Sequence, residues 1–273
     1  MKVFVSIDLE GVSGVFAEAQ TTAGTPQYAQ ARRFMREDLD AVIQGCLAAG
    51  ADEIVVADGH DRQDNLNFDG LPDCVTLASG SPSPLSMMHG MGAGFDCALL
   101  IGYHAMAGTA AAILDHTYTY DVFRVRVDEH REIGELALNA AVAGCFGVPV
   151  AFASGDDKLA AEAAALLPGV RTAVVKQGTA RTAGLLKPPQ EARAALRAGA
   201  QAALSERSWP APLDFNGLPL RLTFTRTGAC DAACWCPGVR RVDARTIDIT
   251  AGDYLQVFSA FLTCVELAYR TRE

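Results

Sequence analysis

Short β-branched runs alternate with helical patterns over the first 160 residues, and this alternation limits the fold more than any other property of the sequence. The run Lys2–Ile7 predicts a strand, and Gln27–Ala49 predicts a long helix that Gly50 ends. Further strands are expected at Glu53–Ala57, Cys97–Ile101, Val122–Val127 and Val148–Ala153, with a helix at Gly134–Ala143. Strands separated by helices favour right-handed βαβ units. We therefore predict an α/β fold with a mainly parallel sheet and helices on both faces.

The pattern changes after about residue 160. Alanine-rich helices are expected at Leu159–Leu167 and Pro189–Glu206, on either side of a short strand at Thr172–Lys176. A proline-containing linker at Arg207–Asn216 precedes two predicted antiparallel strands and a final helix, at Leu218–Arg226, Arg240–Thr250 and Asp253–Tyr269. We therefore expect an α/β metal-binding domain at residues 1–160 and a smaller α+β second domain at residues 161–273.

Charge and hydropathy exclude several classes of partner. The 273 residues carry a formal net charge of −9, so we expect no nucleic-acid partner, because no basic patch would neutralise phosphates. No run approaches the 18 or more apolar residues that a membrane span needs, and Asp8 and Glu10 interrupt the apolar start of the chain. These features predict a cytoplasmic protein without a membrane partner.

Eight cysteines are scattered along the chain. In a reducing compartment we expect them to be small buried hydrophobic residues rather than a disulfide framework. Cys230, Cys234 and Cys236 form the one tight group, and their spacing is not that of a standard zinc site. A metal-binding or redox role for these three residues is the less favoured alternative.

Polar side chains follow three of the predicted strands. Asp8 and Glu10 follow the first, His60 the second and His104 the third, each beside a glycine. Any one of these groups alone is typical of a turn. Because ligands of open α/β sheets bind beyond the carboxyl ends of the strands, we expect the three groups to form one site.

The residue types at this edge point to a metal. Carboxylates together with imidazoles suit Zn²⁺, with Mn²⁺ and Co²⁺ as alternatives. Asp8 and Glu10 lie two residues apart on an extended segment and therefore point to the same side. Glu135 begins a predicted helix, and it is either a further ligand or a glutamate favoured by the helix dipole. Asp58 and Asp61 flank His60 and are expected to orient its imidazole.

Four segments in order, SIDLEGVSG, DGHD, GYHA and IGELALNA, resemble the D-aminopeptidase family associated with dipeptide-transport operons. The resemblance extends over essentially the whole chain. It implies zinc-dependent removal of N-terminal D-residues, notably D-alanine, from short peptides, and a ring-shaped homo-oligomer, a decamer. It also implies two Zn²⁺ per chain, with Asp8 as the bridging ligand and His116 as the catalytic histidine. The metal ligands that it implies are Asp8, Glu10, His60, His104 and Glu135.

The expected reaction is attack by a metal-activated hydroxide on the peptide carbonyl. Three carboxylates offset three of the four positive charges of two Zn²⁺ ions, and the remaining charge lowers the pKa of bound water. His116 would stabilise the oxyanion or pass a proton to the leaving amine, unless it is merely a surface histidine. Its acidic neighbour Asp115 is expected to raise its basicity or to disfavour anionic ligands.

Three other functions remain open from the sequence. A metal-dependent phosphoesterase would use similar ligands but would need arginine or lysine near the metals. A metal-dependent hydrolase of another amide fits the same residues. A non-enzymatic small-molecule-binding protein is less favoured, because it would not need this set of converging carboxylates and histidines.

Overall fold

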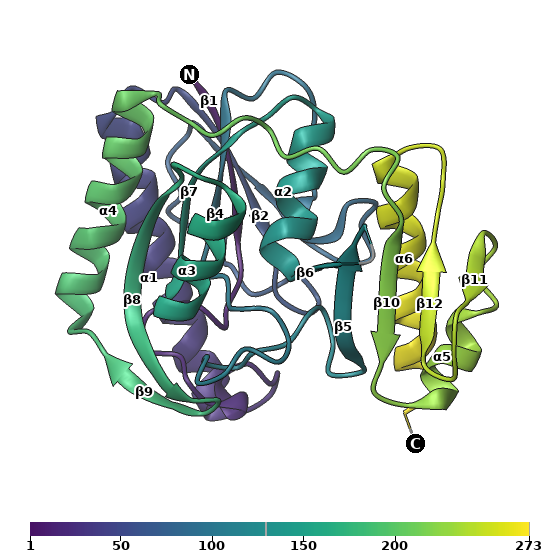
Figure 1. The fold of residues 1–273 in the computed structure, drawn as a ribbon. Helices are drawn as coiled ribbons and strands as arrows, with labels where there is room; N and C mark the ends of the chain where they lie inside the picture. The colour runs from purple at the N-terminus through teal and green to yellow at the C-terminus, as the bar shows by residue number, and fades with distance from the viewer. Residues whose placement is uncertain (129, 273) are drawn as a thin grey trace.

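The computed structural model describes residues 1–128 and 130–272, which form two β-sheets with helices packed around them (Figure 1). The first sheet has the strand order β3-β2-β1-β4-β7-β8-β9, and only β9 is antiparallel to its neighbour. Its strands are β1 (Lys2–Ile7), β2 (Glu53–Asp58), β3 (Val75–Ala78), β4 (Cys97–Ile101), β7 (Val150–Asp156), β8 (Arg171–Ala180) and β9 (Ala183–Leu186). The predicted α/β class with a mainly parallel sheet is confirmed.

Helices cover both faces of this sheet. Alternate side chains of β1 point to opposite faces, so Val3 and Val5 pack on one side and Phe4 on the other. The helices on the Val3 side are α1 (Pro26–Ala48) and α4 (Pro189–Glu206), which lie against each other. The helices on the Phe4 side are α2 (Glu135–Cys145) and α3 (Asp157–Leu166). Two short 3₁₀ helices, Glu18–Gln20 and Ser86–Met88, lie in the loops after β1 and β3.

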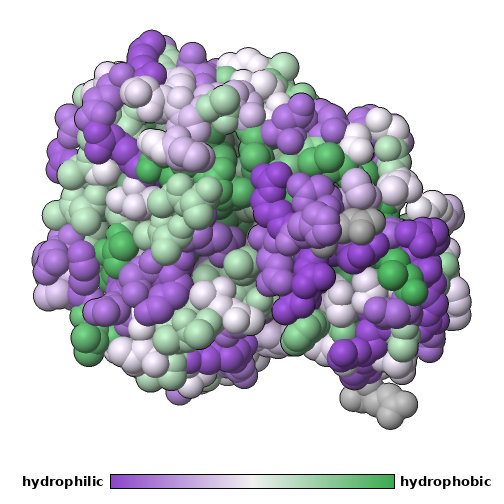
Figure 2. Space-filling view, viewed as in Figure 1, coloured by the Kyte–Doolittle hydropathy of each residue, from purple (hydrophilic) through white to green (hydrophobic). Residues whose placement is uncertain are grey.

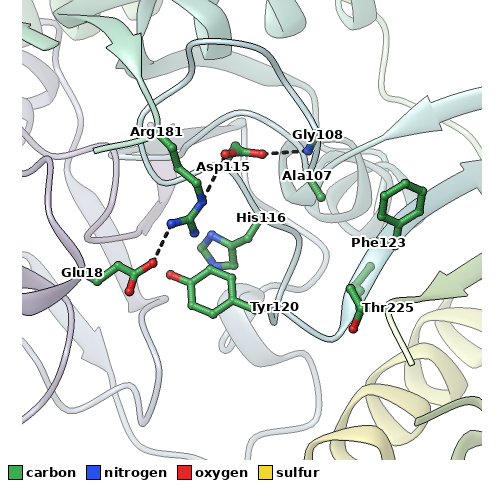
Figure 3. A pocket seen from close by; sticks show the side chains of 10 residues that line it. Glu18, Ala107, Gly108, Asp115, His116, Tyr120, Phe123, Arg181 and Thr225 are labelled. Atoms are coloured by element: carbon green, nitrogen blue, oxygen red, sulfur yellow. Dashed lines mark hydrogen bonds and ion pairs between the residues drawn. The ribbon is translucent and has the colours of Figure 1, made fainter. Parts of the chain in front are cut away.

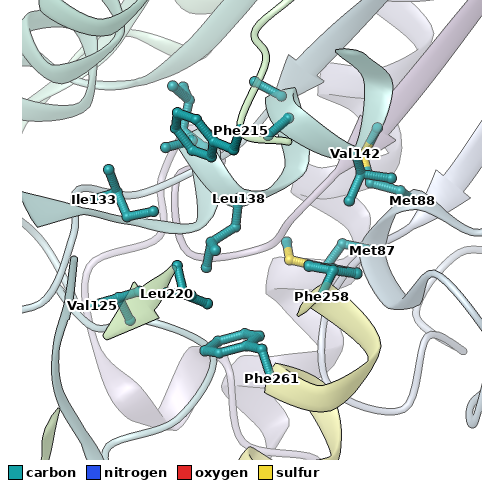
Figure 4. Packing of buried hydrophobic residues seen from close by; sticks show 14 of the residues in the cluster. Met87, Met88, Val125, Ile133, Leu138, Val142, Phe215, Leu220, Phe258 and Phe261 are labelled. Carbon is teal, nitrogen blue, oxygen red and sulfur yellow. The ribbon is translucent and has the colours of Figure 1, made fainter. Parts of the chain in front are cut away.

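The second sheet is antiparallel, with the order β11-β12-β10-β5-β6. Its strands are β5 (Val122–Val127), β6 (Arg131–Ile133), β10 (Leu220–Phe224), β11 (Val239–Arg241) and β12 (Thr246–Ile249). Helices α5 (Thr227–Ala233) and α6 (Tyr254–Tyr269) pack against each other beside it. Figure 4 shows Leu138 of α2, Leu220 of β10 and Phe261 of α6 in one cluster. The two sheets therefore share a hydrophobic core.

The division between the sheets does not coincide with residue 160. Strands β5 and β6 come before that position and lie in the second sheet, whereas β8 and β9 come after it and lie in the first. The predicted strand Arg240–Thr250 is two strands, because Val242 N–H donates to Thr246 O (2.8 Å) and closes a turn. The short elements β3, β9 and α5 were not predicted from the sequence.

None of the helices within residues 1–128 and 130–272 combines the length and apolar character that crossing a lipid bilayer requires. On the face seen in Figure 2, hydrophilic and apolar residues are interspersed over most of the surface.

Candidate metal centre

The predicted strand-end residues lie together at the carboxyl edge of the first sheet. Asp8 and Glu10 follow β1, His60 follows β2 and His104 follows β4. Because β2 and β4 flank β1, this is the point where the strand order reverses and where α/β sheets bind ligands. Gly11 allows the approach of the β1 and β4 ends, since a Cβ built there would lie 1.9 Å from the carbonyl oxygen of Tyr103.

The side chains form two groups of three, and within each group the candidate ligand atoms lie within 4.8 Å of one another. Asp8, Glu10 and His60 make the first group, and His104, His116 and Glu135 make the second group. In the first group, His60 Nδ1 is 3.0 Å from Glu10 Oε2. In the second, Glu135 Oε1 is 3.2 Å from His104 Nε2 and 3.7 Å from His116 Nε2.

Asp8 connects the two groups. Its Oδ1 is 3.6 Å from His60 Nδ1, and its Oδ2 is 3.6 Å from His104 Nε2. A carboxylate whose two oxygens face different histidines has the arrangement of a ligand that bridges two ions.

Each histidine of the centre uses its other ring nitrogen to donate to a backbone carbonyl. His60 Nε2 donates to Thr21 O (2.8 Å), His104 Nδ1 to Ala105 O (3.0 Å) and His116 Nδ1 to Leu114 O (2.8 Å). A carbonyl oxygen can only accept, so the nitrogen facing the centre carries the lone pair when the ring is neutral. This is how protein metal sites commonly fix a histidine ligand.

The residues fit a divalent metal. Glu10 Oε2 and His104 Nε2 are buried, and within the described chain neither has a hydrogen-bond partner. Buried polar atoms normally have partners, so these two atoms indicate a ligand. Both are of the types that bind Zn²⁺, and the imidazoles argue against a site built for Mg²⁺ or Ca²⁺.

The pKa values reflect how closely these charges are packed. Burial, and then the charge of Glu10, raise the pKa of Asp8 to about 7. Burial lowers the pKa of His104, but the carboxylates of Glu135, Asp8 and Glu10 together outweigh it, and the pKa rises to about 10. Burial, and then the neighbouring His104, lower the pKa of His116. The protonation of each of these side chains therefore depends on the charges of its neighbours in the centre.

Glu135 and His116 owe their places to helix α2 and to the loop before β5. Glu135 is the first residue of α2, and its Oε1 accepts from the backbone N–H of Tyr118. The ring of His116 is stacked on that of His104, with centroids 4.0 Å apart. His116 is not a surface histidine, and it belongs to the second group by position.

Two residues that the sequence analysis missed support the centre from behind. Lys176 of β8 is buried, and its Nζ donates to the carbonyl oxygens of Glu10, Val12 and Val15. Its three donors are all used, so it holds the loop that carries Glu10. Glu162 of α3 accepts from Met106 N–H (2.9 Å) beside the second group. A lone lysine in a strand and a lone glutamate in a helix gave no sequence pattern to recognise.

The aspartates beside the histidines have other partners than expected. Asp58 accepts from the backbone N–H groups of His60, Asn65 and Leu66 and therefore fixes the loop rather than the imidazole. The exposed Asp61 has a φ of 48° in a turn, and no bond joins it to the His60 ring. Asp156 caps α3 by accepting from Lys158 N–H and Leu159 N–H.

Most of the cysteines are buried, as expected for small apolar residues. All eight are free, and Cys230 and Cys236 are buried. Burial raises the pKa of Cys230 to about 11, so its thiolate is disfavoured. Within the described residues, Cys230, Cys234 and Cys236 do not form a metal-binding group of the kind seen at the centre.

A cavity of about 340 Å³ opens beside His116 (Figure 3). Arg181 crosses it, with Nη1 2.6 Å from Glu18 Oε1 and Nε 3.4 Å from Asp115 Oδ1, and lies over the ring of Tyr120. Asp115 also accepts from Gly108 N–H (2.8 Å), so its carboxylate is bound away from the His116 ring. The cavity gives a substrate room next to the second group.

Known proteins resemble this chain over nearly its whole length. Residues 1–263 match the family model described as D-aminopeptidase. The chain is 34% identical over 273 residues to the D-aminopeptidase of Bacillus subtilis (strain 168), covering 99% of each chain. A solved structure of Zn-dependent D-aminopeptidase DppA from Bacillus subtilis, a self-compartmentalizing protease, superposes with a TM-score of 0.96 at 33% identity, covering 100% of both chains.

Proposed function

Since the chain belongs to the D-aminopeptidase family, we propose that it is a dinuclear-zinc aminopeptidase that releases N-terminal D-amino acids, D-alanine above all, from short peptides. The observation that carries the proposal is Asp8, whose two oxygens face histidines of different groups. The described zinc dependence of the Bacillus subtilis relative supports the choice of metal.

The residues would hold two ions. Asp8, Glu10 and His60 would bind one, and Asp8, His104 and Glu135 the other. When bound, zinc supplies Lewis acidity, which polarises a carbonyl and makes hydroxide available near neutral pH.

His116 is the residue that we propose for proton transfer. Its Nδ1 is bound to Leu114 O, so the neutral ring offers a lone pair at Nε2 toward the centre. Nε2 would accept a proton from the attacking water and return it to the leaving amine, so the same ring would act first as general base and then as general acid. The stacked His104 keeps the ring in this orientation.

The adjoining cavity would take the part of the peptide beyond the scissile bond. Tyr120 and Phe123 form its apolar walls, and Glu18, Asp115 and Arg181 form its charged side. The cavity volume of about 340 Å³ fits a short peptide rather than a folded chain.

We also propose a ring-shaped homo-oligomer, a decamer, in line with the self-compartmentalizing description of the Bacillus subtilis structure. Leu185 on β9 and Trp235 after α5 are 66% and 80% exposed, and an interface would bury such side chains. The native mass from light scattering tests this, and a monomer would contradict it.

The function is tested by metal analysis together with a hydrolysis panel. The panel contains D-Ala-D-Ala, L-Ala-L-Ala, an amino-acid amide and a phosphoester, each with and without chelator. We expect two zinc ions per chain and chelator-sensitive cleavage of D-Ala-D-Ala. His130→Ala, at an exposed turn, is the control for His104→Ala. Preferred cleavage of the phosphoester or the amide, or a His104→Ala variant as active as the wild type, would contradict the proposal.

A further inference from the structure

Helix α3 supplies no candidate ligand, yet one of its carboxylates reaches the second group from behind. Glu162 Oε2 accepts from the backbone N–H of Met106 (2.9 Å), two residues after His104. Its Oε1 is buried, and within the described residues it has no hydrogen-bond partner. Leaving a buried carboxylate oxygen without a partner costs free energy, so its presence at this place calls for an explanation.

The same carboxylate lies against the turn that leads into Glu135. A Cβ built on Gly134 would lie 2.9 Å from Glu162 Oε1 and 2.7 Å from the Cβ of Met106. Only glycine fits there without a shift of its neighbours. Three segments distant in sequence therefore meet at one point, and two of them carry His104 and Glu135.

We propose that Glu162 is a positioning residue that fixes His104 relative to Glu135 and thereby sets the metal affinity of the second group alone. The inference rests on the proposed dinuclear function. Its selectivity follows from the contacts. The first group follows β1 and β2, and Lys176 holds its loop, whereas the contacts of Glu162 are with the Met106 and Gly134 segments.

The alternative is a purely structural role, in which Glu162 only joins α3 to the loop. That role predicts lower thermal stability with both metals affected alike. A positioning role predicts that one of the two metals binds more weakly while the other keeps its affinity. Removing partners of metal ligands typically weakens binding by about 10- to 100-fold.

The experiment compares Glu162→Ala, Glu162→Gln and the control Glu191→Ala in the full chain. Glu191 lies on α4 with a side chain 59% exposed and pairs with Lys187. Zinc stoichiometry is measured after dialysis at graded free zinc, and Co²⁺ titration follows the visible absorption of each site. We expect Glu162→Ala to lose one metal at about 10- to 100-fold higher free zinc than the wild type.

Two further results are expected. Glu162→Gln retains an acceptor for Met106 N–H and should bind both metals nearly as well as the wild type. Added zinc should restore kcat of Glu162→Ala with KM for D-Ala-D-Ala unchanged, and Glu191→Ala should match the wild type throughout.

The contrary outcomes separate the two proposals. A wild-type protein that binds fewer than two metals would overturn the dinuclear centre, and this inference with it. The inference alone would be overturned if the wild type binds two metals and Glu162→Ala either binds both as tightly as the wild type or binds both more weakly to the same extent.

Discussion

The first and second groups contain the same kinds of side chain, but the fold builds them in different ways. The first group follows β1 and β2, two parallel strands paired in register up to Ile7 and Asp58. The second group takes His104 and His116 from the one long loop between β4 and β5, and Glu135 from the start of α2. Pairing within the sheet therefore places the first group, whereas the second group also needs that loop to pack against the start of α2.

Removing the residue that the groups share should have the largest effect. Asp8→Ala should abolish binding of both metals and lower kcat/KM by at least about 1000-fold, the upper range for loss of one group that stabilises a transition state. Metal analysis and kinetics with D-Ala-D-Ala measure this. Loss of only one metal would mean that Asp8 belongs to a single group.

Removing one histidine from each group should separate them. His60→Ala and His104→Ala should each retain one metal, with kcat/KM lower by about 100-fold because the reacting groups are misplaced. The Co²⁺ spectra of the two variants should differ, and their sum should resemble the wild-type spectrum. Identical spectra would show that the same ion is lost in both.

Lys176→Met tests whether the sheet alone supports the first group. The change leaves the carbonyl oxygens of Glu10, Val12 and Val15 without their ammonium donor. Each unpaired buried group costs about 1 kcal/mol or more, so the free energy of unfolding should fall by about 3 kcal/mol. Urea denaturation measures this, with Lys2→Met, whose side chain is 35% exposed, as the control. An equal fall in the free energy of unfolding of both variants would argue that Lys176 does not support the loop that carries Glu10.

Arg181→Gln should have the smallest effect, because it leaves both groups intact. Without the guanidinium, Glu18 and Asp115 lose their ion-pair partner and repel a free peptide carboxylate. Exposed pairs contribute up to about 1 kcal/mol, so KM for D-Ala-D-Ala should rise by up to about 5-fold. KM for D-Ala-D-Ala-amide should stay unchanged with two metals bound. A change of metal content would place Arg181 in the centre instead of the cavity.

The contrast between the groups also explains which residues of the centre could be predicted from the sequence. Strand periodicity placed β1, β2 and β4, and the rule for sheet edges then brought Asp8, Glu10, His60 and His104 together. Glu135 and His116 followed only from the resemblance to a family, since no periodicity says which loop folds against which strand end.

The supporting residues were beyond the sequence for the same reason. Lys176 and Glu162 act through the main chain of distant loops, so their partners are not marked by any residue type. The division between the two sheets also could not be read from the sequence, because β5 pairs with β10 across about 100 residues.

The carbonyl acceptors of the three histidines have a consequence for how this centre tolerates change. Thr21, Ala105 and Leu114 offer main-chain oxygens, which every amino acid possesses. Substitution at these three positions therefore cannot delete an acceptor, and only a rerouting of the chain can. The path of the backbone, and not the identity of these three residues, therefore fixes the tautomer of each histidine. The side chains at these positions can change without affecting the tautomers.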